Sequence, residues 1–270
     1  MTTSVTALAG PASAAEAPAH GRMARIGFLA YGLFAYAAFF ATFLYLIGFT
    51  AGLLVPKGVD DGPAGPAWLA VAVNAVLVLL FAGQHTVMAR PAFKAVVTRF
   101  IPAPIERSTF VLAACVCLGL LFWLWRPIPT PVWVVEHPWV RAFVWGVCAS
   151  GWGLVLLSSF LISHFDLFGV RQTVLAFLAR RYEHVPFRVV GPYRLVRHPL
   201  MLGFLLAFWA APTMTWGHLL FSGLFTLYIL GGIRIEERDL VRFFGEHYRQ
   251  YRRHVPALFP SPVRRWREHR

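Results

Sequence analysis

Residues 27 to 54 read GFLAYGLFAYAAFFATFLYLIGFTAGLL and contain no charged side chain. A helix needs about 20 apolar residues to cross the hydrocarbon core of a bilayer, and this stretch is long enough. Further apolar runs near residues 67–89, 108–125 and 140–163 meet the same requirement. Because 58% of the residues are hydrophobic and only 14% are charged, we predict an all-α integral membrane protein with about four full transmembrane helices.

The next apolar stretch, residues 200–232, is interrupted by Pro212 and by the pair Gly217-His218. Proline does not continue a helix, so each half of this stretch is short for a full span. We therefore expect a shorter helical hairpin here. A further helix is expected to begin at Glu236 and to end before Pro256.

The basic residues predict which end of each span faces the cytoplasm. Arg22 and Arg25 precede the first span, and the loop between the second and third spans, residues 90–107, is rich in lysine and arginine. The loops at the opposite end are slightly acidic or nearly uncharged. Both termini, together with the arginine-rich segment 164–198, are therefore expected on the cytoplasmic side.

The formal net charge of +13 is compatible with nucleic acid or with anionic lipid as a partner. In a membrane protein the positive-inside bias accounts for such a charge, and no nucleic-acid-binding motif accompanies it. We therefore expect the lipid bilayer as partner and no nucleic acid. The histidines show neither an i, i+4 pair on one helix nor a Glu-x-x-His pattern, so no metal site is predicted.

One motif, Gly-Pro-Tyr-Arg-Leu-Val-Arg-His-Pro at residues 191–199, lies just before the hairpin, and Glu236-Glu237 lies just after it. Unpaired charge is costly at the edge of a membrane, so such residues are a functional hypothesis. Cations on one side and carboxylates on the other, with aromatic walls, suit a ligand that carries an ammonium group, a carboxylate and a flat ring. The alternative is an Arg197–Glu237 ion pair that only closes the hairpin.

A second group, His-Phe-Asp-Leu-Phe-Gly at residues 164–169, begins where the fourth span ends. In a turn, His164 and Asp166 can both point into a cavity at the membrane edge. Alternatively, Asp166 simply pairs with Arg171 at a solvated helix end. His85, near the end of the second span, is expected at a similar depth, so it could face His164 across the bundle or lie at the interface.

These residues resemble a known superfamily. The motif at 191–199, the Glu236-Glu237 pair and Phe-Gly-x-x-Tyr-x-x-Tyr at 244–251 look like the S-adenosylmethionine-binding part of the isoprenylcysteine carboxyl methyltransferase superfamily, over roughly residues 188–260. Upstream, GQHTVMAR at 83–90 and HFDLFGVRQ at 164–172 are similar to the narrower methanethiol S-methyltransferase group, over nearly the whole chain after residue 24.

The resemblance implies methyl transfer from S-adenosylmethionine to methanethiol, and also to hydrogen sulfide, giving dimethyl sulfide or methanethiol. It implies a transmembrane bundle with the acceptor side at 24–187 and a cytoplasmic, helical cofactor-binding region at 188–260 in a bacterial cytoplasmic membrane. A disordered tail is expected at 1–23 and a basic tail at 261–270. The implied cofactor contacts are Tyr193, Arg197, His198, Met201, Glu236, Glu237, Tyr248 and Tyr251. Met201 is a departure, because many members of the superfamily have tyrosine there.

The acceptor must lose its proton, since the thiolate and not the thiol is the nucleophile. The candidates for the general base are Asp166, His164 and His85, with Asp166 first because a desolvated carboxylate is a stronger base. The expected substrate contacts are Phe165, Phe168, Arg171 and Gln172. The sequence does not fix the oligomeric state or the preferred thiol.

Three other functions remain open. The first is a methyltransferase of the same superfamily that acts on an isoprenylcysteine, a lipid or another thiol. The second is a membrane reductase, because sterol reductases share a similar C-terminal helical architecture. The third is a non-enzymatic membrane protein of nitrogen-oxide metabolism, in which the charged residues are only the ends of spans.

Overall fold

In a computed structural model, which describes residues 20–261, almost all of the regular structure is helical. Helices long and apolar enough to cross a membrane are α1 (Arg22–Ala51), α2 (Ala67–Met88), α4 (Ala103–Leu124), α5 (Pro138–Ile162) and α9 (Trp216–Phe244). The first four coincide with the four predicted apolar runs. The chain is therefore an integral membrane protein, and most of its predicted tails, 1–23 and 261–270, lies outside the described residues.

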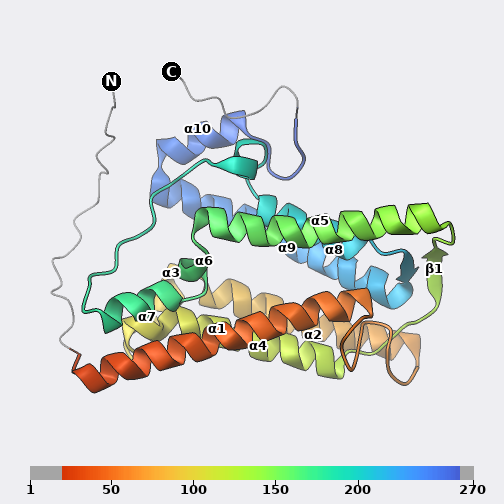
Figure 1. Cartoon of the computed structure of the whole chain (residues 1–270), viewed down its shortest axis with the longest axis horizontal. Coiled ribbons are helices and arrows are strands. Elements are labelled where there is room, and N and C mark those ends of the chain that lie inside the picture. Colours follow the sequence, from red (N-terminus) through yellow and green to blue (C-terminus); the bar gives the residue numbers. More distant parts are fainter. Residues whose placement is uncertain (1–19, 262–270) are drawn as a thin grey trace.

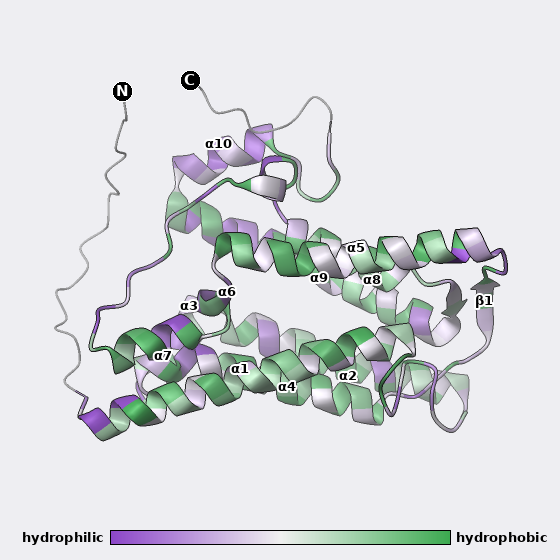
Figure 2. Cartoon of the chain, in the orientation of Figure 1, coloured by the Kyte–Doolittle hydropathy of each residue, from purple (hydrophilic) through white to green (hydrophobic). Residues whose placement is uncertain are grey.

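The long helices form two layers (Figure 1). Helices α1, α2 and α4 pack together in one layer, and α5, the short helix α8 (Pro199–Trp209) and α9 form the other. Figure 2 shows that these helices carry mostly hydrophobic residues, whereas α10 (Glu246–His254) is mostly hydrophilic. Aromatic side chains fill the main core between the layers, including Phe49, Phe122, Trp152, Phe208 and Phe221.

The bundle has two different ends. At one end, β1 (Pro131–Val134) pairs antiparallel with β2 (Thr213–Thr215), and we call this the strand end. The opposite end, which we call the α10 end, carries α10 and three further short helices, as Figure 1 shows. These helices are α3 (Pro91–Val97), α6 (His164–Leu167) and α7 (Val170–Phe177). All the predicted site residues belong to this second end or to the segments that lead into it.

The hairpin formed by α8 and α9 differs from the prediction in its second half. Helix α8 is short, as expected, and ends before Pro212. Helix α9, however, continues without a break from Trp216 to Phe244. The prediction that the second helix of the hairpin is too short to span the membrane was therefore wrong. The reason is that His218 supports the first turn: its backbone N–H donates to Thr215 Oγ1 at 3.0 Å, and its Nε2 contacts the Phe208 carbonyl oxygen at 2.9 Å.

The C-terminal helix also begins later than predicted. Glu236 and Glu237 do not start a new helix but lie inside α9, which ends at Phe244. The break comes at Gly245, whose φ of +58° is accessible to glycine and strained for most other residues. Helix α10 then turns back over the α10 end and stops at His254, just before Pro256.

Helices α5 and α8 approach each other more closely than any side chain would allow at their contact point. A methyl group built on Gly151 would lie 2.6 Å from the Ala207 backbone nitrogen and 2.7 Å from the Gly203 carbonyl oxygen. Small residues are used in this way to bring helices together in membranes. The close contact holds the middle of α8 against the middle of α5, and the motif at 191–199 leads directly into α8.

Candidate functional site

An ion-pair cluster lies where α8 begins and α9 ends. Arg197 Nε donates to Glu237 Oε1 at 2.7 Å, and His198 Nε2 lies 3.1 Å from the same oxygen. The side chains of Arg197 and Glu237 are only 10% and 12% exposed. The structure therefore brings together, across 40 residues of sequence, the cations and the carboxylate that the sequence placed on either side of the hairpin.

The chain after α10 closes this cluster from the outside. The backbone N–H of Arg197 donates to the Pro256 carbonyl oxygen at 2.9 Å, and the backbone N–H of His198 donates to the Ala257 carbonyl oxygen at 3.1 Å. The Arg197 guanidinium also donates to the carbonyl oxygens of Arg252 and Val255. This segment is therefore held against the start of α8 by both backbone and side-chain bonds.

Glu236 differs from its neighbour. Its carboxylate lies 3.6 Å from His198 Nδ1, while its side chain is 45% exposed. Glu237 already binds two partners closely, and Arg252 lies 3.8 Å from its second oxygen. Of the two carboxylates, Glu236 is thus the one with free capacity to bind a ligand, whereas Glu237 holds the cluster together.

The three predicted tyrosines are buried beside the cluster. The Tyr251 hydroxyl donates to the Tyr193 carbonyl oxygen at 2.6 Å. The Tyr193 hydroxyl donates to the Ser158 backbone carbonyl oxygen at 3.4 Å. The Tyr248 hydroxyl is buried and has no partner within residues 20–261. Burial raises the pKa of all three phenols, so they remain neutral. Met201 is placed differently, in the apolar cluster formed by Ile229, Ile233 and Leu258.

His164 is buried in an aromatic enclosure formed by α1, α5 and α6. Its ring stacks on Phe160 at 4.1 Å, and the other surrounding rings are those of Tyr36, Phe39, Phe165 and Phe168. Ser159 Oγ, which donates to the Leu156 carbonyl oxygen, lies 2.9 Å from His164 Nδ1, so it accepts the proton of that nitrogen. Burial lowers the pKa of His164 and so favours the neutral imidazole. In that form Nε2, 3.0 Å from the Tyr36 hydroxyl, accepts.

This burial predicts an acid-sensitive contribution to stability. Burial lowers the pKa of His164, so the folded protein binds fewer protons than the unfolded chain, and stability falls as the pH drops below roughly 6.5. We expect His164→Gln, which cannot titrate, to reduce the loss of melting temperature between roughly pH 7.5 and pH 5 in the detergent-solubilised protein. An equal loss in variant and wild type would contradict this.

Asp166 is occupied by two donors. Its Oδ1 accepts from the Arg171 guanidinium at 2.9 Å, and its Oδ2 accepts from the Tyr182 hydroxyl at 3.2 Å. Burial, followed by the charge of Asp166, raises the pKa of Tyr182. Gln172 donates from Nε2 to the Asp166 backbone carbonyl at 3.1 Å. The predicted pairing of Asp166 with Arg171 at the helix end is therefore present, and no bond joins Asp166 to the His164 ring within the described residues.

His85 lies elsewhere in the bundle, between α2, α4 and α9. Its ring is 4.8 Å from that of Phe110 and 6.3 Å from that of Tyr228, measured between centroids. Its Nδ1 is buried and has no hydrogen-bond partner within the described chain. His85 and His164 have no ring neighbour in common among residues 20–261, so the two histidines do not face each other directly.

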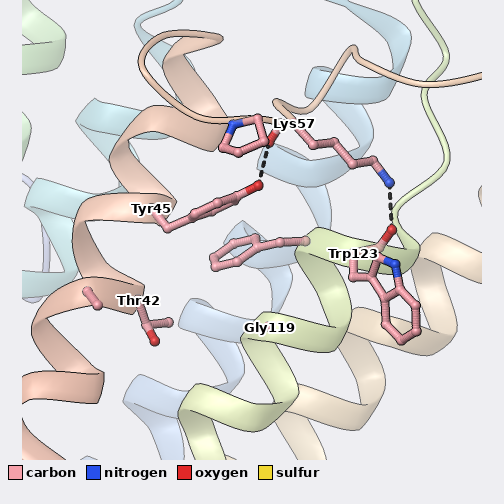
Figure 3. A pocket seen from close by; sticks show the side chains of 8 residues that line it. Thr42, Tyr45, Lys57, Gly119 and Trp123 are labelled. Carbon is pink, nitrogen blue, oxygen red and sulfur yellow. Dashed lines mark hydrogen bonds between the residues drawn. The ribbon is translucent and has the colours of Figure 1, made fainter.

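Two cavities lie away from these clusters. A groove of about 490 Å³ between α1 and α4 is lined by Thr42, Tyr45, Lys57 and Trp123, among others (Figure 3). A second, of about 250 Å³, lies at the strand end, where its lining includes Asp60 and His218. No group of three His, Cys, Asp or Glu side chains able to hold a metal ion is found within residues 20–261.

Sequence reasoning missed residues that only contacts reveal. Tyr36 lies inside the first predicted span, yet it binds His164, and Tyr182 binds Asp166 from a segment without regular structure. Arg107 counted only as a loop charge, but it lies inside α4, which begins at Ala103, and it donates to the Leu167 carbonyl oxygen at 2.7 Å. A charged residue at the edge of an apolar run was the one available signal for Arg107.

Comparison with curated proteins finds close relatives. The chain is 54% identical to the methanethiol S-methyltransferase of Pseudomonas sp. (strain GM41(2012)), over 86% of this chain and 90% of that one. It is 50% identical to the methanethiol S-methyltransferase of Mycobacterium tuberculosis, over 87% and 96% of the two chains. Nurim of Sus scrofa is 28% identical over 61% of this chain and 65% of its own. No family model and no solved structure matches.

Proposed function

Because the chain belongs to the methanethiol S-methyltransferase family, we propose that it transfers a methyl group from S-adenosylmethionine to methanethiol and forms dimethyl sulfide. Hydrogen sulfide is the expected second acceptor, giving methanethiol. The observation that carries the proposal is the identity of about half of all residues over nearly the full length of known relatives. The ion-pair cluster formed by Arg197, His198 and Glu237, which includes part of the motif at 191–199, supports the proposal.

The residues at the start of α8 and the end of α9 fit S-adenosylmethionine chemically. The cofactor would offer a carboxylate to Arg197 and His198, and an ammonium or ribose group to Glu236. The buried Tyr248 hydroxyl has no partner among the described residues, as is expected of a group that a ligand completes. Tyr193 and Tyr251 would frame the site, Met201 would border it, and Glu237 would hold the two cations in place. When bound, S-adenosylmethionine supplies an electrophilic methyl group on a positively charged sulfur.

The acceptor side requires a group that takes the thiol proton. Three residues are candidates, and the hydrogen bonds distinguish them. Both nitrogens of His164 and both carboxylate oxygens of Asp166 are engaged, whereas His85 Nδ1 is free of any described partner. We therefore assign the proton transfer to His85 and a positioning role to Asp166 and His164.

Phe165 and Phe168 are proposed to wall the acceptor site on the α6 side, because sulfur packs well against aromatic rings. Leu167, which lies between them in sequence, accepts from Arg107 of α4, the helix whose Phe110 contacts His85. Phe168 is held by stacking on Phe39 at 3.6 Å, while 49% of Phe165 is exposed. Arg171 and Gln172 keep this turn in place through their bonds to Asp166. The acceptor side would thus be formed by the bundle, residues 24–187, and the cofactor side by residues 188–260.

The distribution of basic residues supports one orientation in the membrane. The α10 end carries the arginine-rich segments, and such segments stay on the cytoplasmic side. We therefore propose that this end faces the cytoplasm of a bacterial cell, where S-adenosylmethionine is made. Both chain termini would lie on the same side.

The decisive experiment is expression in a bacterial host that makes no dimethyl sulfide. Fed with methanethiol, cells that express the chain are expected to release dimethyl sulfide, measured by gas chromatography of the headspace. Cells that carry an empty vector are the control. Dimethyl sulfide at the control level, with the protein present in the membrane, would overturn the proposal. A methylated lipid found instead would indicate the lipid-type methyltransferase.

A further inference from the structure

Arg107 forms no ion pair with a described carboxylate. Its Nε donates to the Leu167 carbonyl oxygen at 2.7 Å, and its Cζ lies 4.6 Å from the centre of the Phe110 ring. Within residues 20–261, no carboxylate oxygen lies within 4.0 Å of its guanidinium, and its two terminal nitrogens have no hydrogen-bond acceptor. The side chain is nonetheless partly buried in the bundle.

Three neighbouring basic residues of the α10 end are paired. Arg90 lies 2.5 Å from an oxygen of Asp239, Lys94 lies 3.8 Å from Glu106, and Arg171 lies 2.9 Å from Asp166. Arg107 lacks such a partner even though an unpaired charge at membrane depth is costly. A fixed cation with free donors in an apolar setting is suited to binding an anion.

The surroundings of Arg107 indicate which anion fits. Phe110 contacts both Arg107, whose Cζ lies 4.6 Å from the centre of the Phe110 ring, and His85, whose ring centroid is 4.8 Å from that of Phe110. A free proton acceptor, a free cation and an aromatic face thus meet within one small region. A small thiol needs these three: a base for its proton, a charge for its sulfur anion and an apolar contact for its methyl group.

We propose that Arg107 is the anion-binding residue of the acceptor site. The S–H bond of the thiol breaks, its electron pair stays on the sulfur that faces the Arg107 guanidinium, and the proton passes to Nδ1 of His85. Phe110 contacts the methyl group. This inference rests on the proposed function and deepens it, because it names the residue that selects an ionised small thiol.

The test compares Arg107→Met with Arg107→Lys and with Arg99→Met, a control at an exposed arginine of the same end. Two readouts are used: methanethiol binding to the cofactor-free protein by calorimetry, and the pH dependence of kcat/KM. For Arg107→Met we expect binding weaker by roughly 10- to 100-fold. The alkaline shift of the pH profile should be about 1 to 3 units, as expected for the loss of one adjacent charge. Arg107→Lys should retain most of the methanethiol affinity and a pH profile close to that of the wild type. Arg99→Met should match the wild type in both readouts.

Unchanged methanethiol affinity and an unchanged pH profile in Arg107→Met would overturn the inference. Equal losses in Arg107→Met and Arg107→Lys, together with a lower melting temperature, would also overturn it, because they would show that Arg107 only anchors α6 through Leu167. S-adenosylmethionine affinity should be unaffected in all variants. If the wild type itself forms no dimethyl sulfide, the proposed function is wrong. If the wild type is active and Arg107→Met is unaffected, only the inference about Arg107 is wrong.

Discussion

Glu237→Gln is expected to destabilise the protein and to weaken S-adenosylmethionine binding together. The carboxylate of Glu237 is the common partner of Arg197 and His198, and removing one member of a buried pair costs about 3 to 5 kcal/mol. The apparent melting temperature should fall by on the order of 10 °C. Cofactor affinity, measured by calorimetry, should fall by roughly 10- to 100-fold, because Arg197 and His198 lose their fixed positions.

Glu236→Gln is the matched control for this prediction, since it makes the same chemical change one residue earlier. Glu236 is 45% exposed and has one longer contact, to His198. We expect cofactor affinity to fall by roughly 10-fold while the melting temperature stays within about a degree of the wild type. If Glu237→Gln instead lowers the melting temperature without a selective loss of affinity, the cluster is only the ion pair that closes the hairpin.

His85→Gln is expected to reduce turnover by about 10²- to 10⁴-fold, the usual contribution of a general base, with little change in cofactor affinity. Glutamine keeps a polar group at this position but does not accept a proton at neutral pH. Initial rates of dimethyl sulfide formation, with cofactor affinity measured in parallel, check this result. Among the described residues His85 makes no ring contact or hydrogen bond with Arg197, His198 or Glu237, so the two effects should separate.

Asp166→Asn is the competing test. Asp166 was the first candidate for the base from sequence, but both of its oxygens are held by Arg171 and Tyr182. We therefore expect a smaller loss of turnover than in His85→Gln, caused by a displaced turn between α6 and α7. If Asp166→Asn removes turnover and His85→Gln does not, Asp166 is the base.

The sequence predicted the four first spans well, since each is a long apolar run whose identity depends only on its own composition. It failed where neighbours decide the structure. Helix α9 was expected to be interrupted at Gly217-His218, but bonds from His218 to Thr215 and Phe208 support it. The break that does occur, at Gly245, depends on a backbone angle that few other residues adopt.

The candidate site could be predicted only in part, because local sequence patterns are visible in the chain whereas contacts between remote segments are not. Residues in a compact motif, such as Arg197 and His198, could be found because their types and spacing are visible in the chain. Their closeness to Glu237 could only be supposed, and the free capacity of Glu236 could not be seen at all. Tyr36 carries no local signal that separates it from an ordinary span residue, and the one signal for Arg107 was its position at the edge of an apolar run.

The sequence by itself determined that this chain lies in a membrane, which end of each span is basic and which family it resembles. These properties depend on the composition and order of residues close together along the chain. Only the tertiary structure decided which charges are neutralised, because pairing depends on distances between helices that are remote in sequence. Arg197 is paired by a residue from another helix, whereas Arg107 has no described carboxylate oxygen within 4.0 Å.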